Sequence, residues 1–327
     1  MAISTDLTTL SGCPVCSSRR LAVQPTPGRW IGPEVFESLR GRIGLMNCRD
    51  CGLDFVNPRP SSALLGLFYA GNTYDCHETG GSASAGASAD FLLSRVLPCL
   101  PAGCPRSVLD YGAGGGGFLL HMRALNWETK GLEPGRRGLS ACRAAGLDVT
   151  DQVDELPTGA YGLVTLHHVF EHLEHPGEVL DTVRRVLAPG GRLFIEVPNR
   201  ASLRARLAWP VLSRRMRIDE RHRAYPIHLV YHDVRTLTRV LADNGWKVEK
   251  SFTVGMGLDE YLVNKPARDA QAAARPAART TPRETGASPV PSAKKYARSP
   301  RRFRRLVRDA YLRMGLGENL AVIARPD

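Results

Sequence analysis

The 327-residue sequence contains no long hydrophobic run and no recognisable leader segment. Its longest apolar stretches are strand-sized, well short of the roughly 20 residues that a membrane-spanning helix needs. The first residues, MAISTDLTTLSG, lack both the basic start and the apolar centre of a signal peptide. We therefore expect a cytoplasmic protein that has no membrane partner.

Cysteine is too sparse for a disulfide scaffold, since eight occur in the whole chain. Four of them form two pairs, Cys13-Pro-Val-Cys16 and Cys48-Arg-Asp-Cys51. Two residues between thiols let both sulfurs reach one ion, and two such pairs complete a tetrahedral shell for zinc. The spacing predicts a structural zinc site with four cysteine ligands, in a zinc-binding module over residues 1–60. Four unlinked thiols are the alternative, and neither pair opens a helix as a redox motif does.

Acidic residues are scarce in the last third of the chain. Residues 200–327 hold 27 of the 44 Lys and Arg but 12 of the 32 Asp and Glu, so the net charge of +12 arises there. A basic surface attracts anions, which favours an anionic partner. Residues 266–300 have little to bury, which predicts a disordered insertion, and residues 301–314 are predicted as a basic helix.

Glycine, by contrast, is abundant in one place, the stretch SVLDYGAGGGGF over residues 107–118. Val108 and Leu109 are typical of a buried strand, and helical spacing begins at Phe118. Glycines between a strand and a helix permit left-handed backbone and a close approach of a ligand. The first N–H groups of the helix then face that ligand. This pattern predicts a nucleotide-type binding loop.

Two ligand classes fit this loop. Gly112, Gly114 and Gly117 satisfy the dinucleotide pattern G-x-G-x-x-G. Asp110, two residues before the first glycine, favours a cationic ligand with an ammonium group, because a pyrophosphate would share one pocket with its carboxylate. Glu133 ends the next predicted strand, where it can accept hydrogen bonds from two ribose hydroxyls.

The pattern Asp110-x-Gly-x-Gly-x-Gly116 resembles motif I of the class I S-adenosylmethionine-dependent methyltransferases. The run Leu-x-Pro-Gly-Gly at 187–191, an apolar strand and Val-Pro-Asn at 197–199 match the same family, whereas dinucleotide dehydrogenases show no such run. The resemblance implies an α/β fold with a doubly wound, Rossmann-like seven-stranded sheet, formed by residues 107–265 plus 315–327. It implies S-adenosylmethionine as the cofactor.

The resemblance also implies which residues hold the cofactor, at the glycine loop and at the ends of the strands around it. Asp151 follows the third predicted strand, where the family places an acid or amide against adenine; Gln152 and Asp154 are equally near. The predicted cofactor residues are Asp110, Tyr111, Gly112, Ala113, Gly114, Gly116, Phe118, Glu133, Pro134, Asp151 and His167.

The run CRDCGLDFVNPRP at 48–60, followed by Tyr69 and Tyr74, resembles zinc-containing methyltransferases of sugar and natural-product pathways. In that family a tyrosine from this segment closes over the substrate, which implies such a role for Tyr74 or Tyr69. Packing of aromatic side chains onto the core is the alternative. Residues 61–106 are expected to form a linker and lid helices.

The segment HHVFEHL at 167–173 follows the fourth predicted strand and resembles a His-x-x-Glu-His pattern of the family. His168, Glu171 and His172 share one face at helical spacing, at the edge of the sheet where ligands bind. Either histidine could serve as a base whose tautomer Glu171 fixes. The alternatives are a divalent metal site and a set of capping and packing groups.

His228 matches a histidine of the family, but Ile227 stands where the family has glutamate. If that glutamate deprotonates carbon in the relatives, its replacement favours an oxygen or nitrogen acceptor here. We expect an enzyme, acting as a monomer or homodimer, that methylates a small molecule such as a sugar nucleotide or natural-product intermediate. An RNA methyltransferase is one alternative, although no basic stretch is interleaved with aromatics to stack bases. A non-catalytic scaffold that binds the cofactor is the other.

Overall fold

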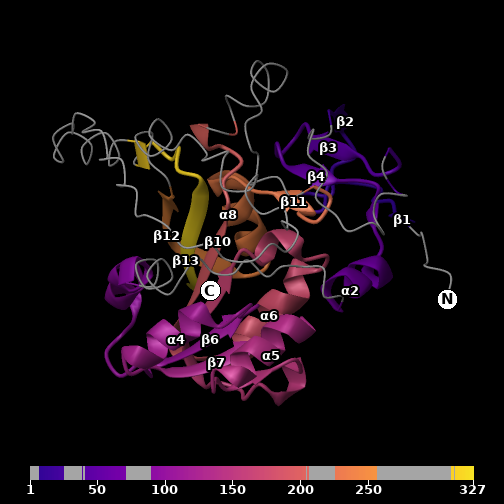
Figure 1. Cartoon of the computed structure of the whole chain (residues 1–327). Coiled ribbons are helices and arrows are strands. Elements are labelled where there is room, and N and C mark those ends of the chain that lie inside the picture. Colours follow the sequence, from indigo (N-terminus) through magenta and orange to yellow (C-terminus); the bar gives the residue numbers. More distant parts are fainter. Residues whose placement is uncertain are drawn as a thin grey trace, which may run out of the picture.

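The structure is a computed structural model of the chain. It describes residues 7–25, 39, 41–70, 90–203, 205, 225–255, 311–312 and 314–327. Tyr74, the predicted insertion 266–300 and nearly all of the predicted helix 301–314 lie outside these ranges. A module of short strands near the N-terminus lies beside a larger α/β part (Figure 1).

The larger part is built on a seven-stranded sheet in the order β12-β13-β10-β9-β6-β7-β8. The pairs within β10-β9-β6-β7-β8 are parallel, whereas β13 is antiparallel to both of its neighbours. This arrangement confirms the predicted doubly wound sheet and the return of the chain end as its seventh strand. The strands are β6 (Ser107–Tyr111), β7 (Glu128–Leu132), β8 (Val149–Thr150), β9 (Tyr161–His167), β10 (Leu187–Pro198), β12 (Trp246–Val254) and β13 (Asn319–Pro326).

Helices connect these strands and carry apolar stripes toward the sheet. They are α4 (Gly117–Ala124), α5 (Arg136–Ala144), α6 (Pro176–Val186) and α8 (Val234–Asp243). In α6, Leu180, Val183 and Val186 are buried at helical spacing. A reciprocal capping box between Asp233 and Thr236 begins α8. Among the described residues, every helix is too short or too polar to span a bilayer.

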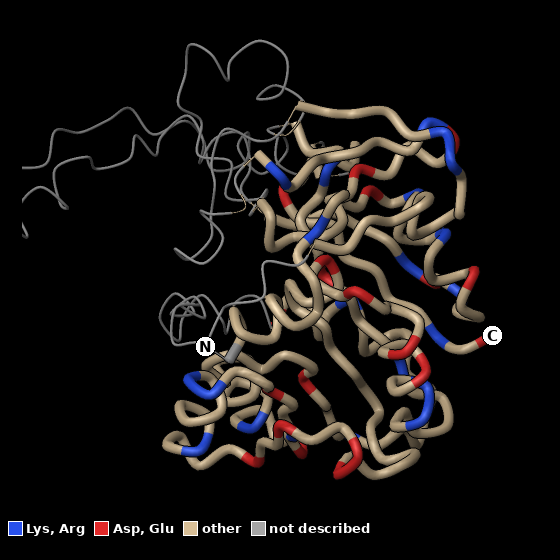
Figure 2. Tube along the Cα trace, turned by 90° about the vertical axis from the view of Figure 1, so that its right-hand side faces the viewer, with Lys and Arg blue, Asp and Glu red and all other residues tan. Residues whose placement is uncertain are grey.

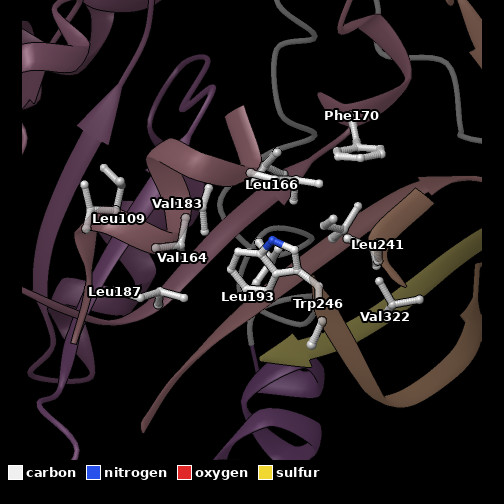
Figure 3. Packing of buried hydrophobic residues seen from close by; sticks show 14 of the residues in the cluster. Leu109, Val164, Leu166, Phe170, Val183, Leu187, Leu193, Leu241, Trp246 and Val322 are labelled. Carbon is white, nitrogen blue, oxygen red and sulfur yellow. The ribbon is translucent and has the colours of Figure 1, made fainter. Parts of the chain in front are cut away.

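Successive residues of the central strands point to opposite faces, so the sheet has a core on each side. On β9, Val164 packs with residues of α6 and α8, whereas Leu163 packs with residues of α4 on the other face. Figure 3 shows part of the first core, in which Val183 of α6 and Leu241 of α8 pack with Trp246 at the start of β12. The two buried faces explain why these strands form continuous apolar runs in the sequence.

The chain reverses its direction of travel across the sheet at β6. It runs outward from β6 to β7 and β8, then crosses back to β9 on the other side of β6. The loops that follow β6 and β9 therefore diverge at the carboxyl ends of the strands, which is where open α/β sheets bind ligands. The glycine loop and the histidine segment are these two loops.

The N-terminal module has a small antiparallel sheet in the order β11-β4-β3-β2. Its strands are β2 (Leu21–Gln24), β3 (Leu45–Cys48), β4 (Asp54–Val56) and β11 (Val230–Tyr231). A second pair joins β1 (Leu7–Thr8) to β5 (Arg59–Pro60), and α2 (Ser62–Ala70) follows. Because β11 comes from beyond β10 in the chain, this sheet extends past the predicted range 1–60 (Figure 1).

Charges of both signs are interspersed along the described chain (Figure 2). The positive charge that the sequence places in its last third belongs largely to residues outside the described ranges.

Candidate active site

The glycine loop after β6 requires glycine at specific positions. Gly112, Gly114 and Gly116 have φ values of +86°, +53° and +79°, which side chains disfavour. A Cβ on Gly112 would lie 2.4 Å from Cγ2 of Val169, and one on Gly116 would lie 2.4 Å from Cδ1 of Leu147. A Cβ on Gly114 would meet nothing within 4 Å, so the loop is packed at both ends and open in its middle.

Glu133 joins this loop to the end of β7. Its Oε2 accepts a hydrogen bond from the N–H of Gly114, and its Oε1 accepts one from Gly135, both at 2.7 Å. Burial raises the pKa of Glu133, and the two N–H donors oppose that rise. Each carboxylate oxygen keeps a lone pair that can accept a hydrogen bond from a ribose hydroxyl, which is the role that the sequence predicts for Glu133.

Asp110 lies within the sheet and is 2% exposed. Its Oδ1 accepts a hydrogen bond from Oγ1 of Thr165 on β9 at 2.7 Å. Burial raises the pKa of Asp110 to about 6, although His167 and Thr165 act in the opposite direction. The carboxyl group therefore changes its charge close to neutral pH.

The other predicted cofactor residues surround these groups. The ring of His167 lies between Phe118, at 4.7 Å between ring centroids, and Phe194, at 5.3 Å. Tyr111 is half-buried and Ala113 is buried in the loop itself. Two further predicted residues, Pro134 beside Glu133 and Asp151 after β8, lie at the ends of their strands. The N–H of Glu133 donates to the carbonyl of Thr150 at 2.9 Å, which ties these two strand ends together.

The loop after β9 forms a short 3-10 turn, η3 (Phe170–His172), that buries Glu171 to 1% exposure. Oε1 of Glu171 lies 3.5 Å from Nδ1 of His168 and 4.0 Å from Nε2 of His228. Burial raises the pKa of Glu171, but these imidazoles and His172 outweigh it and bring the pKa to about 2. The structure thus assembles the predicted His168, Glu171, His172 and His228 around one ionised carboxylate.

His172 has two polar partners at the same ring nitrogen. Its Nδ1 lies 3.2 Å from the carbonyl oxygen of Ile227 and 3.0 Å from the hydroxyl oxygen of Tyr69. A carbonyl can only accept a hydrogen bond, so the contact with Ile227 favours the tautomer with the proton on Nδ1 and the lone pair on Nε2, whereas the Tyr69 hydroxyl can pair with either tautomer. Burial lowers the pKa of His172, which keeps the ring neutral at neutral pH.

His168 differs from His172 in charge and backbone. Its φ of +54° is unusual for a residue with a side chain, a form of strain that clusters at functional sites. Burial lowers the pKa of His168, but Glu171 and Glu196 outweigh it and raise the pKa above its ordinary value. His168, whose side chain is 47% exposed, lies at the edge of the cluster, and its raised pKa favours the charged ring, whereas the lowered pKa of His172 favours the neutral ring.

Two residues of the site, Glu196 and Asn319, were not predicted, whereas Tyr69 was named as the alternative to Tyr74. Tyr69 contacts His172, as the hydrogen-bond distance above shows, while Tyr74 lies outside the described residues. Glu196 on β10 lies 3.6 Å from Nδ1 of His167 and accepts a hydrogen bond from Asn319 at 2.7 Å. Glu196 could have been predicted as a site residue, because it is an ionisable residue inside the apolar run LFIEVP. No local pattern in the sequence marks Asn319.

The four predicted metal ligands lie together. The Sγ atoms of Cys13, Cys16, Cys48 and Cys51 are all within 4.8 Å of one another, and all four are free thiols. Sγ of Cys13 is 3.5 Å from that of Cys51, and Cys16 is 3.5 Å from Cys48. Tetrahedral zinc with Zn–S bonds of about 2.3 Å requires sulfurs about 3.8 Å apart. The donor set and its dimensions fit this ion.

Burial raises the pKa of Cys13 and Cys51, whereas the surroundings of Cys48 favour a thiolate. Burial raises the pKa of Cys48, but backbone N–H groups of Cys51 and Asp50 outweigh it and bring the pKa to about 6. The backbone nitrogen of Cys51 lies 3.5 Å from this sulfur. Sulfur ligands bind zinc as thiolates, so these donors favour the ligating form.

Comparisons with known proteins identify the family of the chain. A family model described as "Methyltransferase domain" matches residues 87–251. The ubiquinone biosynthesis O-methyltransferase of Nitrosococcus oceani is 27% identical over 105 residues, covering 29% of this chain and 44% of that protein. The protein of the same name from Proteus mirabilis is 30% identical over 105 residues, with 29% and 43% covered. The match thus spans less than half the length of these relatives.

Solved structures with some similarity to the chain include two methyltransferases. A SAM-dependent methyltransferase from Archaeoglobus fulgidus is 18% identical with a TM-score of 0.45, covering 77% of this chain and 99% of its own. The plantazolicin methyltransferase BpumL, solved with SAH, is 15% identical with a TM-score of 0.47, covering 80% and 94%. Because the family model spans half of the sequence, on a sheet of the expected topology, the chain belongs to the S-adenosylmethionine-dependent methyltransferases.

Proposed function

We propose that the chain transfers the methyl group of S-adenosylmethionine to an oxygen or nitrogen of a small, anionic acceptor, such as a sugar nucleotide or natural-product intermediate. The observation that carries this proposal is the state of His172. Its lowered pKa favours the neutral ring, its Nδ1 lies 3.2 Å from the carbonyl oxygen of Ile227, and a proton on Nδ1 leaves the Nε2 lone pair to act as a base. A polar acceptor must lose a proton when it is methylated, so a placed base serves this reaction.

Bound S-adenosylmethionine would supply a methyl group activated on a sulfonium. The chain's residues would hold the acceptor in line and take its proton on Nε2 of His172. The imidazolium that results would lie beside the ionised Glu171, which stabilises it. His228, whose ring centroid lies 4.7 Å from that of His172, would border the same volume.

Ile227 supports a polar acceptor over a carbon acceptor. Its side chain is 3% exposed and belongs to an apolar cluster with Tyr225 and Tyr231. No carboxylate therefore occupies the place where the resembling C-methyltransferases have glutamate. The curated relatives are named O-methyltransferases, which agrees with this choice.

On this proposal, Glu133 and the glycine loop bind the cofactor and Asp110 favours its ammonium group. The four cysteines hold a structural zinc ion. The anionic character of the acceptor is supported by the net charge of +12.

The test is to incubate labelled cofactor with candidate acceptors, first sugar nucleotides and small hydroxylated metabolites and then RNA. With an active acceptor, His172→Ala should lower kcat by about 10²-fold while the affinity for S-adenosylhomocysteine stays unchanged. The matched control is His175→Ala, because His175 caps α6 without a side-chain hydrogen bond to that helix. Full activity of His172→Ala would remove this histidine from the mechanism.

The other interpretations of the cluster give different results. Glu171, His172 and His228 offer ligand atoms within 4.8 Å of one another, so a divalent metal there would be shown by loss of activity with a chelator that leaves the cysteine-bound zinc in place, and by recovery with Mg²⁺, Mn²⁺ or Co²⁺. If the cluster only packs the core, its alanine variants would lose thermal stability and cofactor affinity together. Label found only in RNA would overturn the small-molecule acceptor, and cofactor binding without any label transfer would indicate a scaffold.

A further inference from the structure

Residues 225–232 connect the acceptor cluster to the N-terminal module that carries the four cysteines, which we call the cysteine module. Within this segment β11 pairs with β4 of the module, Val230 opposite Phe55. The carbonyl of Leu229 accepts a hydrogen bond from Val56 in the module, and the N–H of Leu229 donates to the carbonyl of Glu171, both at 2.9 Å. The backbone of Leu229, next to His228, is therefore hydrogen-bonded both to the cysteine module and to the loop that carries Glu171.

A second connection runs through α2, which follows the cysteine module directly in the chain. Its residue Tyr69 reaches His172, with Oη 3.0 Å from Nδ1. The carbonyl of Tyr69 also lies close to Gly135, since a Cβ there would be 3.7 Å from it. Both His228 and Tyr69, which border His172, thus come from segments attached to the module.

Arg200 fastens the cysteine module to the large sheet. From its place just after β10, its Nε donates to Oδ2 of Asp54 on β4 at 2.5 Å, and its Nη1 donates to Asp233 at 3.3 Å. Its own N–H donates to the carbonyl of His232 at 2.9 Å. The three charged side chains are 14 to 24% exposed, so loss of the guanidinium would leave two carboxylates facing each other in a poorly hydrated place.

Arg235 on α8 makes a contact with the metal knuckle itself. Its Nη2 donates to the carbonyl of Cys51 at 2.9 Å. A Cβ on Gly52 would lie 2.6 Å from that same nitrogen, so the glycine allows the close fit. The knuckle therefore rests on the helix whose N-cap, Asp233, Arg200 also binds.

From these contacts we infer that the cysteine module is a positioning element of the acceptor site, and that Arg200 is the positioning residue that locks it in place. The module holds His228 and Tyr69 against His172, so its metal state governs turnover of the acceptor. The cofactor loop takes its hydrogen bonds from β7 and from Glu133 instead. This inference rests on the proposed acceptor site but not on the identity of its base.

The test compares Arg200→Gln and Arg200→Lys with wild type, measuring kcat, the KM of the acceptor and the affinity for S-adenosylhomocysteine. Arg200→Gln should lower kcat about tenfold or more, with cofactor affinity within about twofold. Arg200→Lys should recover part of kcat because an ammonium can still pair with one carboxylate. The matched control is Arg192→Gln, which breaks a half-buried pair to Glu249 on β12, 57 positions away in sequence; its kcat should equal that of wild type.

Metal removal gives a second measurement that needs no substitution. Full-length protein treated with a strong chelator should show the same loss of kcat with retained cofactor affinity, and added Zn²⁺ should reverse it. Wild-type kcat in Arg200→Gln or in the metal-free protein would overturn the inference, as would a parallel loss of cofactor affinity. The test of the base is a separate experiment. Full activity of His172→Ala would refute His172 as the base, and the effect of Arg200→Gln would still show whether the cysteine module positions the acceptor site.

Discussion

The cofactor half and the acceptor half of the site are built in different ways. The cofactor half comes from one continuous stretch, in which β6, the glycine loop, α4 and β7 follow each other and Glu133 bonds a loop residue 19 positions away. The acceptor half joins residues 103 and 55 positions apart, since His172 contacts Tyr69 and Ile227. One half is local and the other is long-range.

This difference has a physical consequence. The cofactor half depends on backbone conformation and on N–H groups that the βαβ unit orients by itself. The acceptor half depends on two parts of the molecule docking at the correct distance, through β11, α2 and the Arg200 contacts. Contacts of this kind can be disturbed without unfolding the sheet, so the two halves should respond separately to mutation.

The largest effect is expected where the two halves touch, at Gly112. In Gly112→Val a Cβ would form 2.4 Å from Cγ2 of Val169 at a φ of +86°, so the glycine loop and the histidine loop would both move. Affinity for S-adenosylhomocysteine and kcat should both fall by roughly 10³-fold or become unmeasurable. Calorimetric titration and turnover assays measure the two losses.

The matched control is Gly103→Val. Gly103 has a similar φ of +83° but open space around its Cβ position, so it carries the backbone strain without the clash. A Gly112→Val protein that binds cofactor normally would show that the two loops are not in tight contact.

A smaller and one-sided effect is expected at Glu133. In Glu133→Gln the charge is lost and the amide NH₂ replaces one carboxylate oxygen, so it faces the N–H donor of either Gly114 or Gly135. Affinity for S-adenosylhomocysteine should fall by roughly 10 to 10²-fold, while kcat at saturating cofactor stays near that of wild type. A drop in kcat without a change in the cofactor KM would contradict the separation of the halves.

Local features of the fold and the site could be predicted from the sequence. The glycine loop, Glu133 and the two cysteine pairs depend on spacings of a few residues, and strands buried on both faces leave continuous apolar runs. The same holds for His168, Glu171 and His172, which lie within five residues of each other. The comparisons and the sheet topology confirm the family and the fold that these motifs predicted.

The docking of the cysteine module could not be predicted. Its strand β11 is two residues long and carries no periodic pattern, so nothing in the sequence pairs it with β4. The contact of Tyr69 with His172 depends on where α2 lies in space. The replacement of glutamate by Ile227 is visible in the sequence, but the use of its carbonyl to orient His172 is a property of backbone geometry alone.

The pH dependence of cofactor binding should change by about tenfold through Asp110. Its pKa is raised to about 6, so below pH 6 the free protein carries a protonated carboxyl group there. A cofactor with an ammonium group favours the ionised form, so at low pH binding must first drive off this proton. Affinity should therefore fall about tenfold between about pH 7.5 and about pH 5, and Asp110→Asn should bind more weakly with a flat profile. An equally steep profile in that variant would assign the effect to another group.

The smallest effect is expected at Tyr69, where one hydrogen bond to the base is removed. In Tyr69→Phe the ring stays in its place in α2 while the oxygen 3.0 Å from Nδ1 of His172 is lost. The carbonyl of Ile227 still holds the Nδ1 proton at 3.2 Å, so His172 keeps its tautomer and loses orientation only. A typical hydrogen bond contributes about 1 kcal/mol, which corresponds to about a fivefold decrease in kcat. Cofactor affinity should not change, and Tyr161→Phe, at the far end of β9, should leave kcat unchanged. A loss of cofactor affinity equal to the loss of kcat in Tyr69→Phe would show instead that α2 covers the cofactor and that it belongs to both halves.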